Sequence, residues 1–264
     1  ILALAMASGF TMMGSFSMVQ EGAKAEMGLS DYALSLVQGV SAAVPLVVFS
    51  VPIGILVDRR NRVRLLFLLG LIWTVGTLLT AFAQSLPVLF LARMMAGIGT
   101  TGALTAALSL TADLCAPEQR GRAMLVVTLG KCLGQAGAFA VAGWLLGALL
   151  RAPPAFTHGL APWRGTHVLL AVISLCLILP LLALREPARR EVEAGIHAPF
   201  AIVARELWGR RGFLIPLFIG QVSVVMADAA ASIWASPVLS RGYGLAPEVF
   251  AGWMGALIFS AGLA

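Results

Sequence analysis

Charged residues are scarce in this sequence. Asp, Glu, Lys and Arg make up 11% of its 264 residues, whereas hydrophobic residues make up 59%. Soluble domains carry about 25% charged residues. A soluble protein of this size could not bury so much apolar surface, but a lipid bilayer can solvate it. The composition therefore excludes an ordinary soluble domain and predicts a protein embedded in the bilayer.

Cysteine and histidine are also rare, with three of each. Neither set shows a CxxC pair or the spacing of metal ligands, so the cysteines are interpreted as small buried apolar residues. The motifs GxSxG, P-loop and HExxH are missing too. The sequence thus predicts no metal site, no cofactor and no enzyme activity. The residues concerned are Cys115, Cys132, Cys176, His158, His167 and His197.

The basic charge of the chain does not indicate a nucleic-acid partner, although the formal net charge is +6. Most arginines stand at the ends of apolar runs rather than along one polar face, which is the pattern of a membrane protein. The chain begins at Ile1, already inside an apolar run and without a signal peptide. We therefore expect it to be part of a longer protein.

The sequence is rich in long apolar segments. A helix rises about 1.5 Å per residue, so about 20 residues cross the ~30 Å of hydrocarbon in a bilayer. Eight segments of this kind predict an all-α, polytopic membrane bundle, and the last is cut short by the end of the chain. The segments are Ile1–Val19, Leu34–Val57, Leu65–Ala83, Leu86–Ala112, Ala123–Leu150, Thr166–Leu184, Phe213–Leu239 and Phe250–Ala264.

Short basic loops between these segments predict the orientation. Basic residues in short loops stay on the cytoplasmic side of the membrane. The loops 58–64, 113–122 and 185–212 hold twelve arginines, whereas the loops on the other side hold four basic residues. We therefore expect the first three loops to be cytoplasmic and the chain to be a multi-pass protein of the cell (inner) membrane.

The longest loop divides the sequence into two halves. Within it, Pro199–Trp208 is either a short amphipathic helix at the membrane surface or the polar start of the seventh span. Gly28–Gly39 parallels Gly244–Gly255 at an offset of 216 residues, which carries the first span onto the seventh. Parallel repeats of six spans are typical of transporters. The expected organisation is a six-helix bundle over 1–184, a cytoplasmic linker over 185–212 and the start of a second bundle over 213–264.

Three motifs at helix ends resemble those of the major facilitator superfamily. Gly54–Arg62, with the sequence Gly-Ile-Leu-Val-Asp-Arg-Arg-Asn-Arg, resembles the family's loop between its second and third helices. Arg93–Gly99 resembles its fourth-helix motif, and Asp113–Ala123 resembles its next cytoplasmic loop. The resemblance implies two bundles of six helices, of which this chain would hold the first and less than two helices of the second.

The same resemblance implies a function. Members of the family are secondary transporters that work by alternating access, so we expect a small organic or amphipathic solute as substrate and protons or another ion as the coupling partner. The competing hypothesis is a non-transporting receptor or regulator on the same fold.

A finer resemblance is to the bacterial spinster-type branch of the family. Members of that branch often carry an Asp-Arg pair in the first helix and a Glu in the fourth, where this chain has Met12, Met13 and Thr100. This departure speaks against proton coupling through the usual acid. The matching segments are Leu29–Asp31, Leu36–Gly39, Asp58–Arg62, and Trp234 followed by Arg241–Leu245.

The residue types in the loop 58–64, which we call the basic turn, can also be explained on physical grounds. Asp58 ends one helix, where it can cap backbone N–H groups of a neighbouring helix. Asn61 stands where a positive φ is expected, and Arg59 and Arg62 can pair with Asp58 or with lipid phosphate. The resemblance implies that Gly54, Asp58, Arg59 and Arg62 form a conformational latch between the halves. The alternative is a plain basic anchor at the membrane surface.

Polar residues inside the spans form three stripes. A charge in mid-membrane costs at least ~2.5–3.5 kcal/mol, so each should face a wet cavity or a partner. Arginine and lysine could instead snorkel to the nearer interface, and Lys131 could pair with Asp228. In the resembled fold these helices line the central cavity, which predicts a substrate or ion path along the stripes. The stripes are Arg93 with Thr100, Lys131 with Gln135, and Gln221 with Asp228 and Ser232.

Two glycines in the fifth span indicate close helix packing. Gly130 and Gly134 form a GxxxG motif, which lets the backbone of another helix approach. Antiporters of the resembled family often have a Gly-Pro step in this helix, but this chain lacks the proline, so we interpret the motif as tight packing.

Overall fold

The apolar segments form long helices because a helix satisfies every backbone N–H and C=O within its own segment, which a bilayer requires. The computed structural model describes residues 1–153, 159–189 and 200–262. In this part of the chain, seven helical spans are long and apolar enough to cross a membrane. The helices are α1 (Leu2–Gly14), α2 (Phe16–Met27), α3 (Asp31–Ser35), η1 (Leu36–Val40), α4 (Ser41–Arg59), α5 (Arg62–Phe82), α6 (Leu86–Leu114), η2 (Pro117–Gln119), α7 (Arg120–Arg151), α8 (Pro162–Ile178), η3 (Leu179–Ala183), α9 (Phe200–Gly209), α10 (Arg211–Pro237), η4 (Val238–Gly242) and α11 (Pro247–Ala261).

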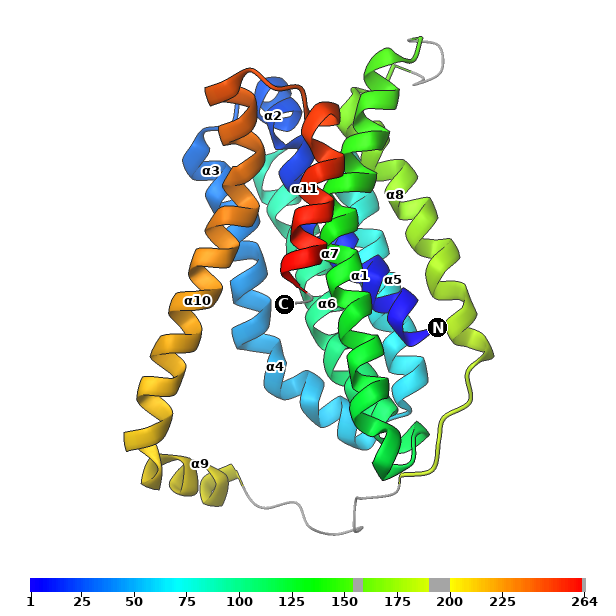
Figure 1. Cartoon of the computed structure of the whole chain (residues 1–264), viewed down its shortest axis with the longest axis vertical. Helices are drawn as coiled ribbons and strands as arrows, with labels where there is room; N and C mark the ends of the chain where they lie inside the picture. Colours follow the sequence, from blue (N-terminus) through cyan, green and yellow to red (C-terminus); the bar gives the residue numbers. More distant parts are fainter. Residues whose placement is uncertain (154–158, 190–199, 263–264) are drawn as a thin grey trace.

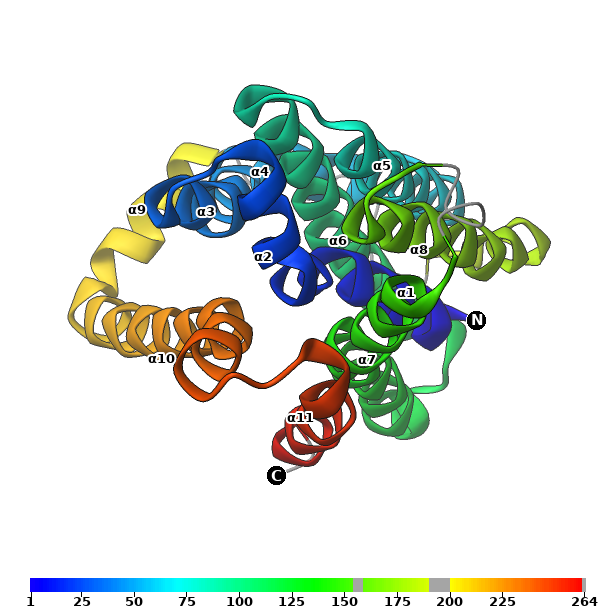
Figure 2. The same cartoon turned by 90° about the horizontal axis from the view of Figure 1, so that it is seen from above.

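Six spans form one bundle, seen from above in Figure 2. α5 packs along α6, α1 packs along α7, α4 leans on α6, and α8 covers α5. The core lies between these helices and contains Trp73, Met12 and Phe16, each at most 1% exposed. The turn between α4 and α5 and the start of α7 lie at the lower end of the bundle in Figure 1. We call this the basic end and its counterpart the opposite end.

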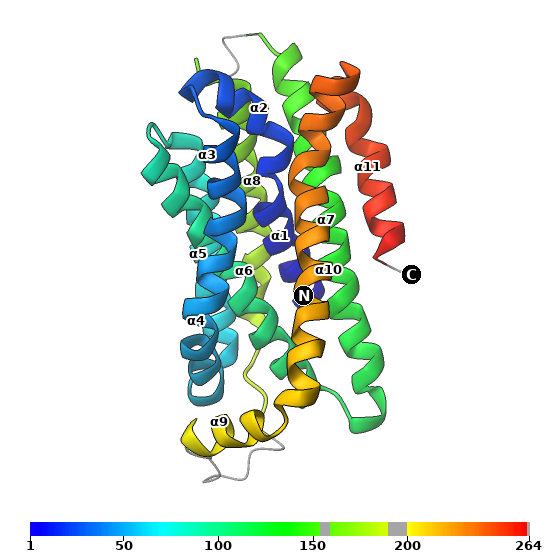
Figure 3. The ribbon, with the colours of Figure 1, turned by 90° about the vertical axis from the view of Figure 1, so that its left-hand side faces the viewer.

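The last two long helices stand against this bundle in different ways. α11 packs closely along α7, whereas α10 contacts the bundle mainly through α2 at the opposite end. From there α10 runs away from the bundle toward the basic end (Figure 1). α9 crosses the basic end at a steep angle to α10 (Figure 3). The second half of the chain is therefore joined to the first mainly at the opposite end.

Three spans contain irregular turns. The first span breaks at Ser15, between α1 and α2. A π-helical turn, η1, connects α3 with α4, and a second one, η4, ends α10. Such turns interrupt the regular hydrogen-bond ladder, and they are frequent at functional sites.

The all-α, multi-span fold predicted from the sequence is confirmed, and the main correction concerns helix length. The first span reaches Met27 rather than Val19, because ion pairs and backbone caps allow polar residues to extend the helix beyond its apolar core. The eighth segment forms α11, which has 15 residues and is shorter than the other spans. Gly28 and Gly244, which the sequence parallel aligns, both adopt left-handed conformations, with φ of 64° and 66°.

The linker segment for which the sequence allowed two interpretations forms a separate helix. α9 begins at Phe200 and ends at Gly209, and it is separated from α10 at Arg210. Its polar side is held by an ion pair between Glu206 and Arg210 at 2.7 Å. Its placement at a membrane surface stays a prediction.

Candidate functional site

The basic turn places one arginine inside the protein. Arg62, at the start of α5, is 1% exposed. Its Nη1 donates to the Asp113 carboxylate at the end of α6, and its Nε donates to Oε1 of Glu186 at 2.8 Å. The other Glu186 oxygen accepts the backbone N–H of Val63 at 3.0 Å. One guanidinium therefore joins α5, α6 and the first residues of the linker.

This geometry corrects two expectations about the turn. Arg62 turns inward to Asp113 and Glu186 instead of pairing with Asp58, which is exposed and has no polar partner among the described residues. Asn61 has a φ of −65° rather than a positive φ, and its side chain accepts the backbone N–H of Arg64 at 2.8 Å. Asn61, not Asp58, is therefore the residue that caps the neighbouring helix.

The other two residues of the predicted latch lie on the surface of the turn. Arg59 is exposed. Gly54 is half-buried, and a Cβ built on it would meet nothing within 4 Å. No backbone in the described part of the chain lies so close to Gly54 that a side chain there would clash. The latch role of Gly54 and Arg59 stays a prediction.

The break in the first span is held by Arg93. Its guanidinium donates to the carbonyl of Met12 at 3.1 Å and also to that of Met13, two carbonyls at the break. It also lies over the ring of Phe16, 5.5 Å from the centroid. Because Arg93 is 5% exposed, it does not snorkel to an interface. Its charge is compensated by the backbone dipoles of α1.

Thr100 lies on the same face of α6, as its spacing predicted, and this face also packs on α1. Its hydroxyl donates to the carbonyl of Gly9 at 3.0 Å, and the residue is 1% exposed. Arg93 and Thr100 thus hold α1 against α6, with neither side chain open to a cavity. Their place beside a solute path stays a prediction.

α7 has two exposed faces of opposite character. One face carries large apolar side chains, Val126, Leu133 and Trp144, all more than half exposed. The other carries Lys131 and Gln135, both half-buried. A lysine ammonium is costly in lipid, so the apolar face is the one suited to contact lipid and the polar face must meet water or protein. Lys131 Nζ lies 5.6 Å from the centroid of the Phe10 ring of α1.

The polar residues of α10 are accessible. Gln221 and Asp228 are exposed, and Ser232 is half-buried. The pairing of Lys131 with Asp228 that the sequence left possible does not occur, since neither residue has an ion partner among the described residues. No group of three or more metal-ligating side chains occurs in that part of the chain either.

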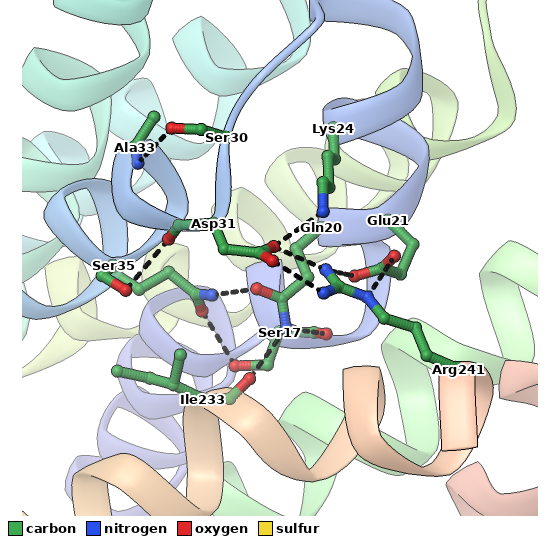
Figure 4. A network of polar contacts seen from close by, with 11 residues as sticks. Ser17, Gln20, Glu21, Lys24, Ser30, Asp31, Ala33, Ser35, Ile233 and Arg241 are labelled. Carbon is green, nitrogen blue, oxygen red and sulfur yellow. Dashed lines mark hydrogen bonds and ion pairs between the residues drawn. The ribbon is translucent and has the colours of Figure 1, made fainter. Parts of the chain in front are cut away.

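A polar network at the opposite end joins the two halves (Figure 4). Arg241, in η4, binds two carboxylates at once. Its guanidinium contacts both oxygens of Glu21 at 2.7 and 3.0 Å, and both oxygens of Asp31 at 2.8 and 3.0 Å. Beneath it, the Gln20 side chain donates to the backbone carbonyl of Ile233 in α10 at 2.7 Å.

Sequence reasoning missed this network. Arg241 was used only as one of the few basic residues outside the predicted cytoplasmic loops and as part of the resemblance to the spinster-type branch, with no ion partner predicted for it. The acidic residues were a further signal, because Glu21 and Asp31 stand at the same predicted membrane surface as Arg241. Unlike charges at the ends of spans on one surface can pair, but the sequence does not show which spans are neighbours.

Comparison with known proteins settles the family. A model of the Major Facilitator Superfamily matches residues 1–264, the whole chain. The chain belongs to the major facilitator superfamily. Its fold agrees with that family in solved structures. A bacterial homolog of the human lysosomal transporter Spinster, in an inward-facing, unoccupied conformation, aligns with a TM-score of 0.85 and 23% identity. The alignment covers 99% of this chain and 59% of that one.

Curated relatives within the superfamily carry transporter names. A probable 4-methylmuconolactone transporter of Cupriavidus pinatubonensis is 37% identical over 139 residues, which are 51% of this chain and 32% of that protein. A putative niacin/nicotinamide transporter of Bacillus subtilis is 30% identical over 97 residues, 37% of this chain and 22% of that protein. A 3-(3-hydroxy-phenyl)propionate transporter of Escherichia coli is 35% identical over 83 residues, 31% of this chain and 21% of that protein. The matches thus span a third or less of each relative.

Membership of the major facilitator superfamily gives the geometry a context. The family is one of multi-pass membrane transporters rather than enzymes, and the seven spans agree with it. The Arg62 cluster and the Arg241 network lie at opposite ends of the bundle, and the polar face of α7 lies between them.

Proposed function

We propose that the protein is a secondary transporter that moves a small organic anion across the inner membrane by alternating access. In this mechanism the two halves rock around a binding site near the middle of the membrane. The path residues in the proposal are Lys131 and Gln135 on α7 and Gln221, Asp228 and Ser232 on α10. Arg93 and Thr100 border the path indirectly, because they hold α1 in place beside Lys131. Asp228 is the candidate for binding a coupling ion, a proton or another cation.

The observation that carries the proposal is the unpaired cation on the polar face of α7. Lys131 stands well inside a 32-residue helix, half-buried, over an aromatic ring and without a carboxylate partner among the described residues. Such a group needs an anion or water, and an organic acid supplies both a carboxylate for the ammonium and an apolar body for the ring. The names of the relatives, which include a phenylpropionate and a niacin transporter, favour the same class of solute.

Uptake by the full-length protein in proteoliposomes tests the function. Nicotinate and nicotinamide have the same ring but differ in charge, so wild type should take up nicotinate faster if Lys131 binds a carboxylate. Replacing Lys131 with Gln should raise the KM for nicotinate roughly 10- to 100-fold, the value of one charge-assisted hydrogen bond, and should abolish the preference for the acid.

Arg122→Gln is the matched control, because Arg122 is an exposed cation near the start of the same helix. Its kinetics should resemble those of wild type. Equal loss in both variants would show a general charge effect and contradict the role of Lys131. Ligand binding without any flux would indicate the receptor alternative instead.

The latch is tested at Asp58. Its carboxylate is exposed and has no partner in the described part of the first half, so it is free to contact the second half when the halves move. Asp58→Asn should slow transport several-fold while leaving the thermal midpoint of unfolding unchanged, because no described contact is lost. Transport at the wild-type rate would leave the turn as a basic anchor only.

A further inference from the structure

We propose that a groove between α7 and α11, at the opposite end of the bundle, binds one phospholipid whose headgroup carries a primary ammonium, phosphatidylethanolamine. α11 packs along α7 (Figure 1), and a groove of about 650 Å³ lies between the two helices. Its lining includes Val141, Trp144 and Arg151 of α7 and Glu248 and Gly252 of α11. Lipid binding in this groove does not depend on the transport function proposed above.

The groove lies on the apolar face of α7. Trp144 follows Leu133 by eleven residues and Arg151 follows Trp144 by seven, so all three lie on one face of the helix. This is the face with large exposed apolar side chains, which is suited to lipid. At about 100° per residue, Lys131 lies roughly opposite. A ligand of the groove therefore comes from the bilayer rather than from the polar face of α7.

The polarity of the groove changes along its length. The charged residues stand at its outer end, with Arg151 in the last turn of α7 and Glu248 in the first turn of α11. Toward the middle of the membrane its lining includes Ala140, Val141 and Gly252. From Ala140 to Arg151 the helix rises ~16 Å, about half of the ~30 Å hydrocarbon thickness. A charged end followed by an apolar stretch one leaflet deep fits a headgroup with an acyl chain rather than a water-soluble solute.

The two charges of the groove are close but do not share a hydrogen bond. Arg151 Nη1 lies 3.9 Å from Oε1 of Glu248, which is beyond hydrogen-bond distance. Oε2 of Glu248 is buried and has no partner among the described residues. Gly147 lets Glu248 lie against α7, because a Cβ at Gly147 would be 2.6 Å from the Cβ of Glu248. A carboxylate held in this way at a membrane surface favours a cationic N–H donor as its partner.

An ethanolamine headgroup matches this pair of charges. Its phosphate and its ammonium are joined by two methylene groups, so they can bind Arg151 and Glu248 at the same time. Phosphatidylglycerol brings no cation for the carboxylate, and phosphatidylcholine has a quaternary ammonium without N–H donors. Trp144 lies two turns deeper than Arg151, where its indole N–H can donate to an ester carbonyl of the lipid.

Lipid binding to the delipidated full-length protein tests the headgroup preference. Native mass spectrometry compares the first bound molecule of dioleoyl phosphatidylethanolamine, phosphatidylcholine and phosphatidylglycerol. Wild type should bind phosphatidylethanolamine roughly tenfold more tightly than phosphatidylcholine, the value of one charge-assisted hydrogen bond. Glu248→Gln should remove this preference. Arg151→Gln should weaken the binding of all three lipids, because each has a phosphate.

Glu21→Gln is the matched control for the carboxylate. Glu21 is at the same end and does not line the groove, and its side chain is 32% exposed, compared with 28% for Glu248. This variant should keep the wild-type preference. Equal affinity of wild type for the three lipids, or the same loss in Glu21→Gln as in Glu248→Gln, would overturn the proposal.

Gly252→Leu tests whether the lipid occupies the groove itself. A Cβ at Gly252 meets nothing within 4 Å, and leucine is a better helix former than glycine, so the side chain should enter the groove without destabilising the helix. The affinity for phosphatidylethanolamine should fall tenfold or more. A phosphatidylethanolamine with a diazirine on its acyl chain should cross-link to α7 or α11 in wild type but not in this variant. Unchanged lipid binding with a lowered thermal midpoint would identify another protein segment as the occupant and refute the lipid site.

Discussion

Replacing Arg62 with methionine is expected to lower the free energy of unfolding by about 3–5 kcal/mol, the cost of removing one partner from a buried ion pair. The side chain of Arg62 is 2% exposed, and that of Asp113 is 10% exposed. Without the guanidinium, the Asp113 carboxylate would remain in a poorly hydrated site between α5 and α6. Glu186 would lose its ion pair and keep only its hydrogen bond to the backbone N–H of Val63. The effect is measured as the thermal midpoint of unfolding in detergent, and the readout is the loss of monodisperse protein on heating.

Three variants separate this explanation from a general loss of positive charge. Arg64→Met removes an exposed cation two residues away and should leave the midpoint unchanged. Arg62→Lys should be nearly as damaging as Arg62→Met, because an ammonium cannot fork to two carboxylates as a guanidinium does. Adding Asp113→Asn and Glu186→Gln to Arg62→Met should restore part of the stability. A triple variant less stable than Arg62→Met would contradict the buried-charge argument.

In the Arg62 cluster, the sequence motif predicted the position of the turn correctly but not the partners of its buried arginine. The charge pattern of the turn gave its position between two spans and its resemblance to the family. The partners of Arg62, however, lie 51 and 124 residues away. A turn motif contains no information about contacts over such separations, so the local acid Asp58 was the only partner that spacing could offer.

Periodicity had a similar limit inside the membrane. The spacing of Arg93 and Thr100 correctly placed them on one face of a helix. Periodicity does not show what that face meets, and the structure places α1 there. The seven-residue interval therefore predicted the polar stripe. It did not predict that the backbone carbonyls of Gly9, Met12 and Met13 accept hydrogen bonds from these side chains. Lys131 differs because it is half-buried over the Phe10 ring and has no ion partner in the described part of the chain.

Arg241 was overlooked for a different reason. Counting basic residues by loop treats each as a topological signal and ignores its pairing. An arginine on the side with few basic residues is unusual under that rule, and four acidic residues share its predicted surface. The excess of acidic residues around Arg241 could have suggested a structural ion pair. Which spans are neighbours, and therefore which acids can reach Arg241, is known only from the fold.

Gly130→Ala is expected to be the most damaging methyl addition on α7, with a loss of about 3 kcal/mol, the upper end of the usual overpacking cost. A Cβ at Gly130 would lie 2.3 Å from the carbonyl oxygen of Ala3 and 2.7 Å from its Cα. Both atoms belong to the backbone of α1, so no side-chain rotation relieves the clash. The GxxxG motif predicted a close helix approach, and the structure identifies α1 as the partner.

The same substitution at Gly121 provides the control within one helix. A Cβ there meets nothing within 4 Å, so Gly121→Ala should raise stability by roughly 0.5–1 kcal/mol through helix propensity. The two variants should therefore shift the thermal midpoint in opposite directions. A rise for both would mean that α1 moves away from α7 at little cost.

The clash at Gly130 also has a consequence for transport. α1 carries Phe10, the ring beneath Lys131, and Thr11, whose hydroxyl donates to the carbonyl of Gly134 at 3.1 Å. Displacing α1 would move the ring away from the ammonium and break this hydrogen bond. Gly130→Ala protein rescued at low temperature should therefore show a raised KM for an organic acid, whereas Gly121→Ala protein should not. A normal KM in a destabilised Gly130→Ala protein would separate the packing of α1 from the binding site and place Lys131 outside it.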